Sequence, residues 1–424
     1  MANYFNFPNN KKKKSEITDH SVFAEELLVP FLNHSDAYRI NMFSSHFSQL
    51  VHLKTPEYPK VFTNFENQVG EYSLSYKKAD DDCEIIAKIK KNELNYDLIV
   101  RYKSTGVYDY IPVRYAAYIT EEYGSHMDDC ISDKEVGSTI KKGEFIFKAP
   151  NYDDEGNFSY GVNLKTCYHQ FEGLTDEDAV VISESAANKL VSYKVEETFI
   201  SVNTNDILLN IYPTEEYGYH SIPKVGEHTL GRILCASRRQ DSSTALYTFQ
   251  HDRMREISET TDDITYSNGA MVADMDIYCN IPIEQMRKRR NEFNREVVSL
   301  LEEQHRYYKE LAAVLETIIP VAKEEQLLSV MSNYEKAVYD NERKEYGYHF
   351  ARPLPKQLNE NKYSDSLAFA WKQAHEYLDN RIKWRVDGKA FHNLKIRFLL
   401  VKENPVTVGL KLTGRLTSGV WKNC

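Results

Sequence analysis

The chain has 424 residues, of which 42% are hydrophobic and 27% are charged, with 30 Tyr and 19 Phe. This length exceeds the usual size of one hydrophobic core, so we expect two or more packed modules and not a disordered chain. The formal charge of −10 excludes a surface that is basic throughout, so any contact with nucleic acid has to be local.

The N-terminal segment, residues 1–20, is a polar tail without the apolar core of a signal peptide. Its lysine run, Lys11–Lys14, fits a frayed and solvated segment, with phosphate contact as the alternative. The next segment, residues 21–54, begins with the stretch Ser21–Leu32, which predicts a short apolar helix. It continues into Asp36–Val51, a mixed polar and apolar stretch whose side chains are suited to face a ligand.

Residues 55–194 are predicted to be mostly β. Short β-rich stretches are separated by Asp, Asn and Gly turns and comprise Cys83–Ile89, Tyr96–Tyr102 and Gly143–Phe147. Farther on, the alternation over Val162–Tyr168 predicts another strand, and the apolar run Ala179–Ile182 indicates a buried one.

The chain then continues as β through Gly231–Cys235 and Met271–Cys279 before its apolar period changes from two to about 3.6. Between residues 283 and 319, apolar side chains recur at spacings of three, four and seven, which predicts a long amphipathic helix. These side chains are Met286, Phe293, Val297, Leu300, Tyr307, Leu311 and Leu315. The stripe favours core packing or helix pairing, with Gln326–Tyr339 as the candidate partner.

The last part of the chain contains a predicted helix, Ser364–Lys383, and a predicted strand, Leu394–Val401. Residues 405–421 form a strand-turn segment rich in Gly and basic residues, and the sequence stops three residues later. Because domain ends are more often polar and frayed, this abrupt stop predicts that the remaining piece of the module lies on another chain.

The six cysteines are far apart, without a CxxC pair or a zinc-finger spacing. We therefore interpret them as free thiols in a reducing cytoplasm. The sequence also lacks an apolar run of about 18 residues, so we expect no membrane span and a cytoplasmic location.

Three groups of residues carry candidate chemistry, and the first surrounds Arg39. The guanidinium of arginine forms paired, charge-assisted hydrogen bonds with phosphate oxygens, so Arg39 is a candidate ligand of a triphosphate. A local ion pair between Arg39 and Asp36 is the alternative.

The second group is the acidic run Asp176, Glu177 and Asp178 within residues 173–184. Three adjacent carboxylates oppose one another's ionisation unless a cation relieves them, which a divalent metal or a metal-bound nucleotide would do. An acidic cap in which Thr175 or Asp176 starts a turn or helix is the alternative.

The third group, residues 409–415, has glycines that let the backbone approach a phosphate and two cations, Lys411 and Arg415. It differs from a nucleotide-binding P-loop because the Gly-Lys-Thr/Ser ending is absent. A solvated basic turn is the alternative.

Taken in order, these segments resemble the β subunit of cellular DNA-dependent RNA polymerases. Residues 28–39 resemble the family's apolar-Pro-Phe-Leu-x-His-x-Asp-Ala-x-Arg segment, and residues 173–184 resemble its Gly-Tyr-Asn-Phe-Glu-Asp motif, which ends in Ser-Glu. Residues 224–232 resemble the turn at which the family's flap begins. Residues 409–420 resemble Gly-Asp-Lys-x-x-Gly-Arg-His-Gly-Asn-Lys-Gly-Val, although Leu410 replaces the Asp and the second Lys is missing.

The resemblance implies roles for individual residues. Arg39 would lie near the triphosphate of the incoming nucleotide, and Gln49 near the nascent RNA or the fork. Glu177 and Asp178 would stand close to the second Mg²⁺ without holding the primary ion. Lys411 would contact phosphates at the RNA 3′ end, and Arg415 would either contact the nucleic-acid backbone or have a structural role.

The resemblance also implies a mixed α+β, multi-module fold. A double-psi β-barrel would combine the Glu177–Asp178 segment with residues 394–424, and residues 195–393 would form a flap-like insertion with a long helical, coiled segment. The family's large N-terminal and C-terminal parts have no counterpart here, so we expect a split subunit fragment of the kind found in giant bacteriophages.

Such a fragment would be active only in a complex. It would need β′-type polymerase chains with the aspartates for the primary Mg²⁺, the other β fragments, a promoter-specificity factor, template DNA, the RNA transcript and NTPs. Two rival hypotheses are a virion or assembly scaffold that oligomerises through the helix at 283–319, and a metal-dependent nucleotidyl hydrolase built on residues 176–178.

Overall fold

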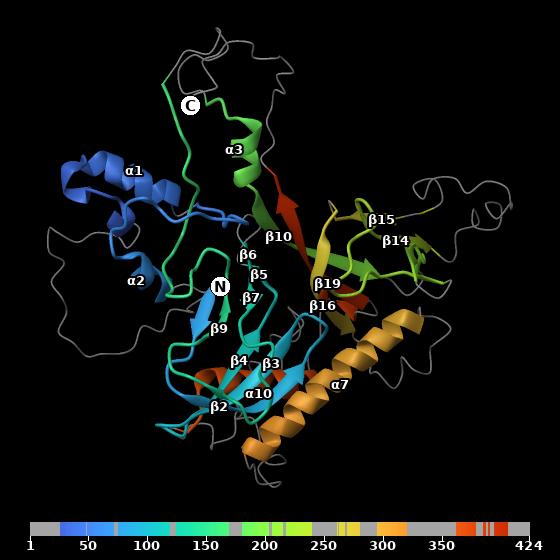
Figure 1. Cartoon of the computed structure of the whole chain (residues 1–424). Coiled ribbons are helices and arrows are strands. Elements are labelled where there is room, and N and C mark those ends of the chain that lie inside the picture. Colours follow the sequence, from blue (N-terminus) through green and yellow to red (C-terminus); the bar gives the residue numbers. More distant parts are fainter. Residues whose placement is uncertain are drawn as a thin grey trace.

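The chain is a mixed α and β protein whose described sheets are antiparallel (Figure 1), which confirms the mixed α and β composition that was expected. The computed structural model describes residues 26–47, 49–71, 75–118, 124–168, 180–202, 206–214, 218–239, 261, 263–267, 269–279, 295–319, 362–378, 385–386, 389–390 and 394–405. The double-psi β-barrel stays a prediction, because the segments around Glu177 and Lys411 lie outside these ranges.

The described chain begins with two single turns of 3-10 helix, η1 (Glu26–Leu28) and η2 (Leu32–His34), and continues into α1 (Ala37–Phe47). The prediction of one helix reaching residue 32 is therefore wrong over its described part. The physical cause is local: Pro30 lacks a backbone N–H, and Phe31 adopts the left-handed conformation with φ of 58°.

A four-stranded sheet with the order β4-β3-β2-β8 forms one module of the fold. Its strands are β2 (Cys83–Lys90), β3 (Tyr96–Tyr102), β4 (Tyr108–Val113) and β8 (Thr139–Ile140). In β2 the alternate side chains from Cys83 to Ile89 are buried, as period-two patterning predicts. Both strands predicted for this region are thus confirmed.

Short elements lie before, between and after these strands in the sequence. They are α2 (Glu66–Glu71), β1 (Tyr76–Lys78), β5 (Ala116–Tyr118), β6 (Gly124–His126), β7 (Asp128–Asp129) and β9 (Phe145–Lys148). The order β1-β9-β7 forms a small sheet, and β5 pairs with β6. The strand predicted near residue 145 is therefore confirmed as β9.

The strand predicted over Val162–Tyr168 is wrong. These residues form no strand, and only the preceding Gly161 makes an isolated bridge, to Glu57. Residues 164–168 are exposed, so their alternation has no sheet on which to pack. The apolar run that follows is also not buried in this chain, since Val180 and Val181 are exposed.

A central sheet joins segments that are far apart in sequence, with the order β10-β19-β16. Its strands are β10 (Ser192–Val202), β16 (Met271–Cys279) and β19 (Leu394–Asn404). β10 and β19 pair along their whole length, from Ser192 opposite Asn404 to Val202 opposite Leu394. The chain therefore leaves this sheet and returns to it at neighbouring positions, while the module boundaries at 195 and 393 remain predictions.

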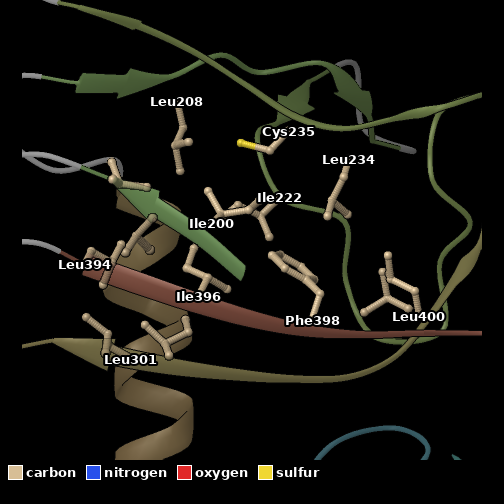
Figure 2. Packing of buried hydrophobic residues seen from close by; sticks show 14 of the residues in the cluster. Ile200, Leu208, Ile222, Leu234, Cys235, Leu301, Leu394, Ile396, Phe398 and Leu400 are labelled. Carbon is tan, nitrogen blue, oxygen red and sulfur yellow. The ribbon is translucent and has the colours of Figure 1, made fainter. Parts of the chain in front are cut away.

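The chain between β10 and β19 adds smaller β elements. A three-stranded sheet consists of β11 (Asp206–Leu208), β14 (Ile233–Arg239) and β15 (Asp263–Tyr266). Two-stranded pairs are formed by β12 (Tyr212–Pro213) with β13 (Tyr219–His220), and by β17 (Arg385–Val386) with β18 (Lys389–Ala390). Figure 2 shows side chains from β10, β14 and β19 packed with Leu301 in one apolar core.

One long helix connects the central sheet with the four-stranded sheet, and a second helix packs beside it. The long helix α7 (Arg295–Ile318) places its first turns in the core of the central sheet and its later turns against β2, β4 and α10 (Asp365–Leu378). The apolar stripe is buried at Val297, Tyr307, Leu311 and Leu315, as its spacing predicts. Residues 283–294 and the candidate partner Gln326–Tyr339 lie outside the described ranges. None of the helices in these ranges has the length and apolar content needed to cross a membrane.

Candidate functional site

Arg39 and Gln49, the two candidate residues of the first group that the structure describes, are both exposed. Arg39 lies on α1, a helix without a buried residue, and its Nη1 approaches Met42 Sδ at 3.8 Å. Gln49 follows the helix and donates its backbone N–H to the carbonyl oxygen of His46 at 3.2 Å. Among the described ion pairs none joins Arg39 to Asp36, so the local pairing alternative is not realised.

The C-terminal end of α1 is fixed to the body of the protein by aromatic packing. Phe47 meets the rings of Phe158 and Tyr160 edge-on at 5.9 and 5.3 Å. Just beyond, His52 Nδ1 and Ser125 Oγ form a hydrogen bond of 2.8 Å, and burial lowers the pKa of His52 to about 4. The imidazole is therefore neutral at physiological pH. The exposed helix α1 is thus supported at its C-terminal end by packed side chains.

Glu177 and Asp178 lie outside the described residues, as does the alternative acidic cap at Thr175 or Asp176. The structure does describe both flanks of the acidic run Asp176, Glu177 and Asp178, which we call the acidic motif. After the motif, Ser183 caps the short helix α3 (Glu184–Lys189) by accepting a hydrogen bond from Ala186 N at 3.2 Å.

Glu57 joins the two flanks of the acidic motif. Its Oε1 accepts a hydrogen bond from Lys189 Nζ at 2.7 Å, on the far side of the motif. Its Oε2 accepts from the backbone N and from Nδ2 of Asn163, on the near side, at 3.0 and 3.3 Å. The hydrogen bond from Lys189, followed by those from Asn163, lowers the pKa of Glu57 to about 2, so the carboxylate is ionised.

The residues just before Glu57 attach the same segment to the central sheet. Leu53 forms an antiparallel bridge with Ser192, and Lys54 N donates to Val191 O at 2.8 Å. The Lys54 side chain forms an ion pair with Glu403 near the end of β19, shortly before Lys411 and Arg415, which lie outside the described residues. We call residues 53–58 the anchor segment, because it follows the first candidate group in sequence and contacts the chain on both sides of the second group and shortly before the third.

Sequence reasoning missed the anchor segment. Lys189 and Asn163 are separated from Glu57 by 132 and 106 residues, and Lys54 is separated from Glu403 by 349. Ordinary Glu, Lys and Asn residues at such separations produce no motif or periodic signal. Only the fold brings them together.

The described residues contain no group of three His, Cys, Asp or Glu side chains that could hold a metal ion. They therefore do not supply a donor set for Mg²⁺, and the roles of Glu177 and Asp178 near the metal remain predictions. Cys83, Cys130, Cys167 and Cys235 carry free thiols, in agreement with their spacing in sequence.

The turn at residues 224–232 folds against β16. Gly226 N donates to Val272 O and Thr229 N to Ala270 O, each at 2.8 Å. Gly226 and Gly231 have φ of 92° and 60°, which favours glycine at these positions. This motif is thus part of the packed body around the central sheet.

The fold and these contacts define a mixed α and β protein in which one anchor segment contacts the chain near the second and third candidate groups. No protein-family model matches the chain. About half of its length is nevertheless similar to proteins named DNA-directed RNA polymerase subunit beta, at 29% identity over 224 residues for that of Cytophaga hutchinsonii (51% of this chain, 16% of the relative).

Two further relatives carry the same name. The protein of Thermus thermophilus is 32% identical over 160 residues, covering 37% of this chain and 13% of the relative. That of Mesostigma viride is 30% identical over 214 residues, covering 49% of this chain and 18% of the relative. The chain thus contains a β-subunit-like region and spans less than a fifth of the length of these relatives.

Proposed function

We propose that this chain is a fragment of the β subunit of a multisubunit DNA-directed RNA polymerase and is active only within the assembled enzyme. The observation that carries the proposal is the similarity to named β subunits over 224 residues, about half of the chain. The ordered motifs around Arg39, Glu177, residues 224–232 and Lys411 add to its support.

In the proposed reaction the RNA 3′-hydroxyl attacks the α-phosphate of an NTP, and pyrophosphate leaves. Arg39 contacts the triphosphate, which agrees with its exposed position on α1. Gln49 lies near the RNA or the fork, and Lys411 and Arg415 contact the RNA phosphates and the backbone. Glu177 and Asp178 orient the triphosphate beside the second metal ion.

The proposed assembly contains further polypeptide chains. A β′-type chain contributes the aspartates that hold the primary Mg²⁺, and other β fragments complete the subunit around template DNA and transcript. Mg²⁺ supplies charge neutralisation at the phosphates when bound. This chain's own contribution is to bind and orient nucleotide and RNA.

A promoter-specificity factor is the further proposed partner, docked on the region 236–280. Deletion of that whole range is a poor test, because β16 within it pairs with β19 from Met271–Val401 to Cys279–Leu394. A deletion of 240–260 between the paired strands β14 and β15 retains the central sheet. It should impair promoter-directed initiation and preserve elongation on a preformed RNA–DNA scaffold, and equal loss of both activities would reject this docking site.

The scaffold alternative is less favoured by the fold. Its oligomerisation device would be the apolar stripe of α7, but in this chain Leu311 and Leu315 are buried against its own strands and α10. Burial inside the protomer leaves that stripe unavailable for pairing with another copy.

The proposal is tested by isolating the tagged chain from its native cells, identifying the bound polypeptides by mass spectrometry and assaying template-directed NTP incorporation. We expect a co-purifying chain with an aspartate-rich loop, and activity lost in the double variant Glu177→Ala/Asp178→Ala. The matched control is Glu93→Ala, which removes a carboxylate that pairs with Lys90 and whose side chain is 75% exposed. A homo-oligomer without such partners or activity would support the scaffold hypothesis instead.

A further inference from the structure

The anchor segment presents a carboxylate whose two oxygens serve different parts of the chain. Glu57 Oε1 binds Lys189 at the end of α3, and Oε2 binds both nitrogens of Asn163. The chain adds two backbone contacts here: Glu57 N donates to Gly161 O at 2.8 Å, and Asn163 Nδ2 donates to Tyr58 O at 2.7 Å. One carboxylate thus holds the chain at Asn163, before the acidic motif, and at Lys189, after it.

These contacts restrict the local geometry of the chain more than they stabilise the fold. The side chains of Lys189 and Glu57 are 50% and 36% exposed, so water screens their attraction, and a pair of this kind contributes little to global stability. A charged acceptor that binds a backbone N–H and a side-chain amide together nevertheless fixes direction as well as distance. Loss of Glu57 should therefore release the flanks of the motif without unfolding the protein.

The same segment follows directly from α1, which carries Arg39 and precedes Gln49. Phe47 and Leu50 hold that end of the helix in the aromatic cluster around Phe158. Leu53 and Lys54 hold the segment itself on the central sheet. Loss of the Glu57 carboxylate would consequently release the chain at Asn163 and Lys189 while the C-terminal end of α1 stays in place.

We propose that Glu57 is a positioning residue for the proposed reaction. Through Asn163 and Lys189 it holds both flanks of the acidic motif on the anchor segment. This inference rests on the proposed function. It assigns Glu57 no contact with substrate, so its effect on nucleotide addition is exerted through Asn163 and Lys189.

The first test is hydrogen exchange in the full chain and does not depend on polymerase activity. Glu57→Ala should accelerate amide exchange at 161–163 and at 187–190 and leave 85–100, in the four-stranded sheet, unchanged. Lys189→Ala, which removes only the cation, should accelerate exchange at 187–190 and provides the same test if Glu57→Ala does not fold. Unchanged exchange at these flanks would overturn the proposal.

The second test is kinetic and uses the assembled enzyme. Glu57→Ala should lower kcat/KM for NTP by up to roughly 100-fold, the scale expected for an orienting group displaced by about 1 Å, while binding of the RNA–DNA scaffold stays unchanged. Adding Lys189→Ala to Glu57→Ala should cause little further loss, since both changes break one connection. Glu57→Gln, which keeps an acceptor oxygen but loses the charge, should lie between wild type and Glu57→Ala.

The outcomes separate this inference from the proposed function. Faster exchange with wild-type NTP kinetics in an active assembly would reduce Glu57 to a structural residue and overturn the inference, while the polymerase proposal stands. An inactive wild-type assembly would instead reject the proposed function.

Discussion

Two clusters of polar side chains in this protein differ in how deeply they are buried. In the interior, Lys91 Nζ lies 2.6 Å from Asp274 Oδ2 and 2.9 Å from Asp276 Oδ1, and Arg397 Nη1 lies 3.0 Å from Asp276 Oδ2. These side chains join the connection between β2 and β3 to the central sheet and are largely buried. The cluster around Glu57 makes similar hydrogen bonds but remains half-exposed.

The comparison teaches that stability and positioning are carried by different contacts. Burial pushes the pKa of Lys91 down, yet the charges of Asp276 and Asp274 raise it above the ordinary value, so the ammonium stays protonated. Removal of one partner there leaves uncompensated buried charge. At Glu57 water replaces the lost partner, and only the local arrangement changes.

The largest effect is expected for Lys91→Ala. Asp274 and Asp276 would lose their shared cation in a buried site, which should lower the free energy of unfolding by about 3–5 kcal/mol. Urea denaturation measures this loss, with Lys90→Ala, on the exposed side of the same strand end, as the control. A loss at Lys91 no larger than that at Lys90 would contradict a role of the interior cluster in joining the modules.

A somewhat smaller effect is expected for Leu311→Ala. Leu311 is fully buried where α7 packs on α10 and β2, and the cavity left behind should lower the free energy of unfolding by about 3 kcal/mol. Glu310→Ala, at an exposed position on the same helix, is the control for helix propensity. Equal denaturation midpoints for the two variants would mean that α7 does not unite the modules in solution.

The next effect is a pH dependence at His52. Below pH 6.5 the unfolded chain protonates this imidazole while the folded chain, with a pKa of about 4, does not. The stabilisation is therefore complete above pH 6.5 and is lost as the pH falls towards 4, by about 2 kcal/mol at pH 5. Comparing urea denaturation of wild type and His52→Gln at pH 7 and 5 isolates this contribution from other histidines, and parallel losses in both proteins would refute it.

The smallest effect on stability is expected for Glu57→Ala. Because this carboxylate is solvated, the denaturation midpoint of the variant should match that of wild type. The amide exchange and the NTP kinetics described above should nevertheless change. A midpoint as low as that of Lys91→Ala would erase the distinction between the two clusters.

Several elements follow from local sequence alone. The alternation in Cys83–Ile89 and the three-to-four spacing in α7 predict their elements because each pattern presents one apolar face to a core. The error at Val162–Tyr168 has the complementary cause: alternation predicts a strand only when a neighbouring strand is present, and the sequence does not say which segments become neighbours.

For the candidate site, the ordered motifs predict roles for Arg39, Gln49, Glu177, Asp178, Lys411 and Arg415, and these roles stay predictions. Sequence reasoning did not identify Glu57 or its partners, because Glu57 and Lys189 are 132 residues apart and neither belongs to a motif. Side-chain chemistry and short-range spacing are thus written in the sequence. Only the tertiary structure decided that one anchor segment contacts Asn163, Lys189 and Glu403. The reason is that strand pairing and the packing of distant segments determine which carboxylate meets which cation.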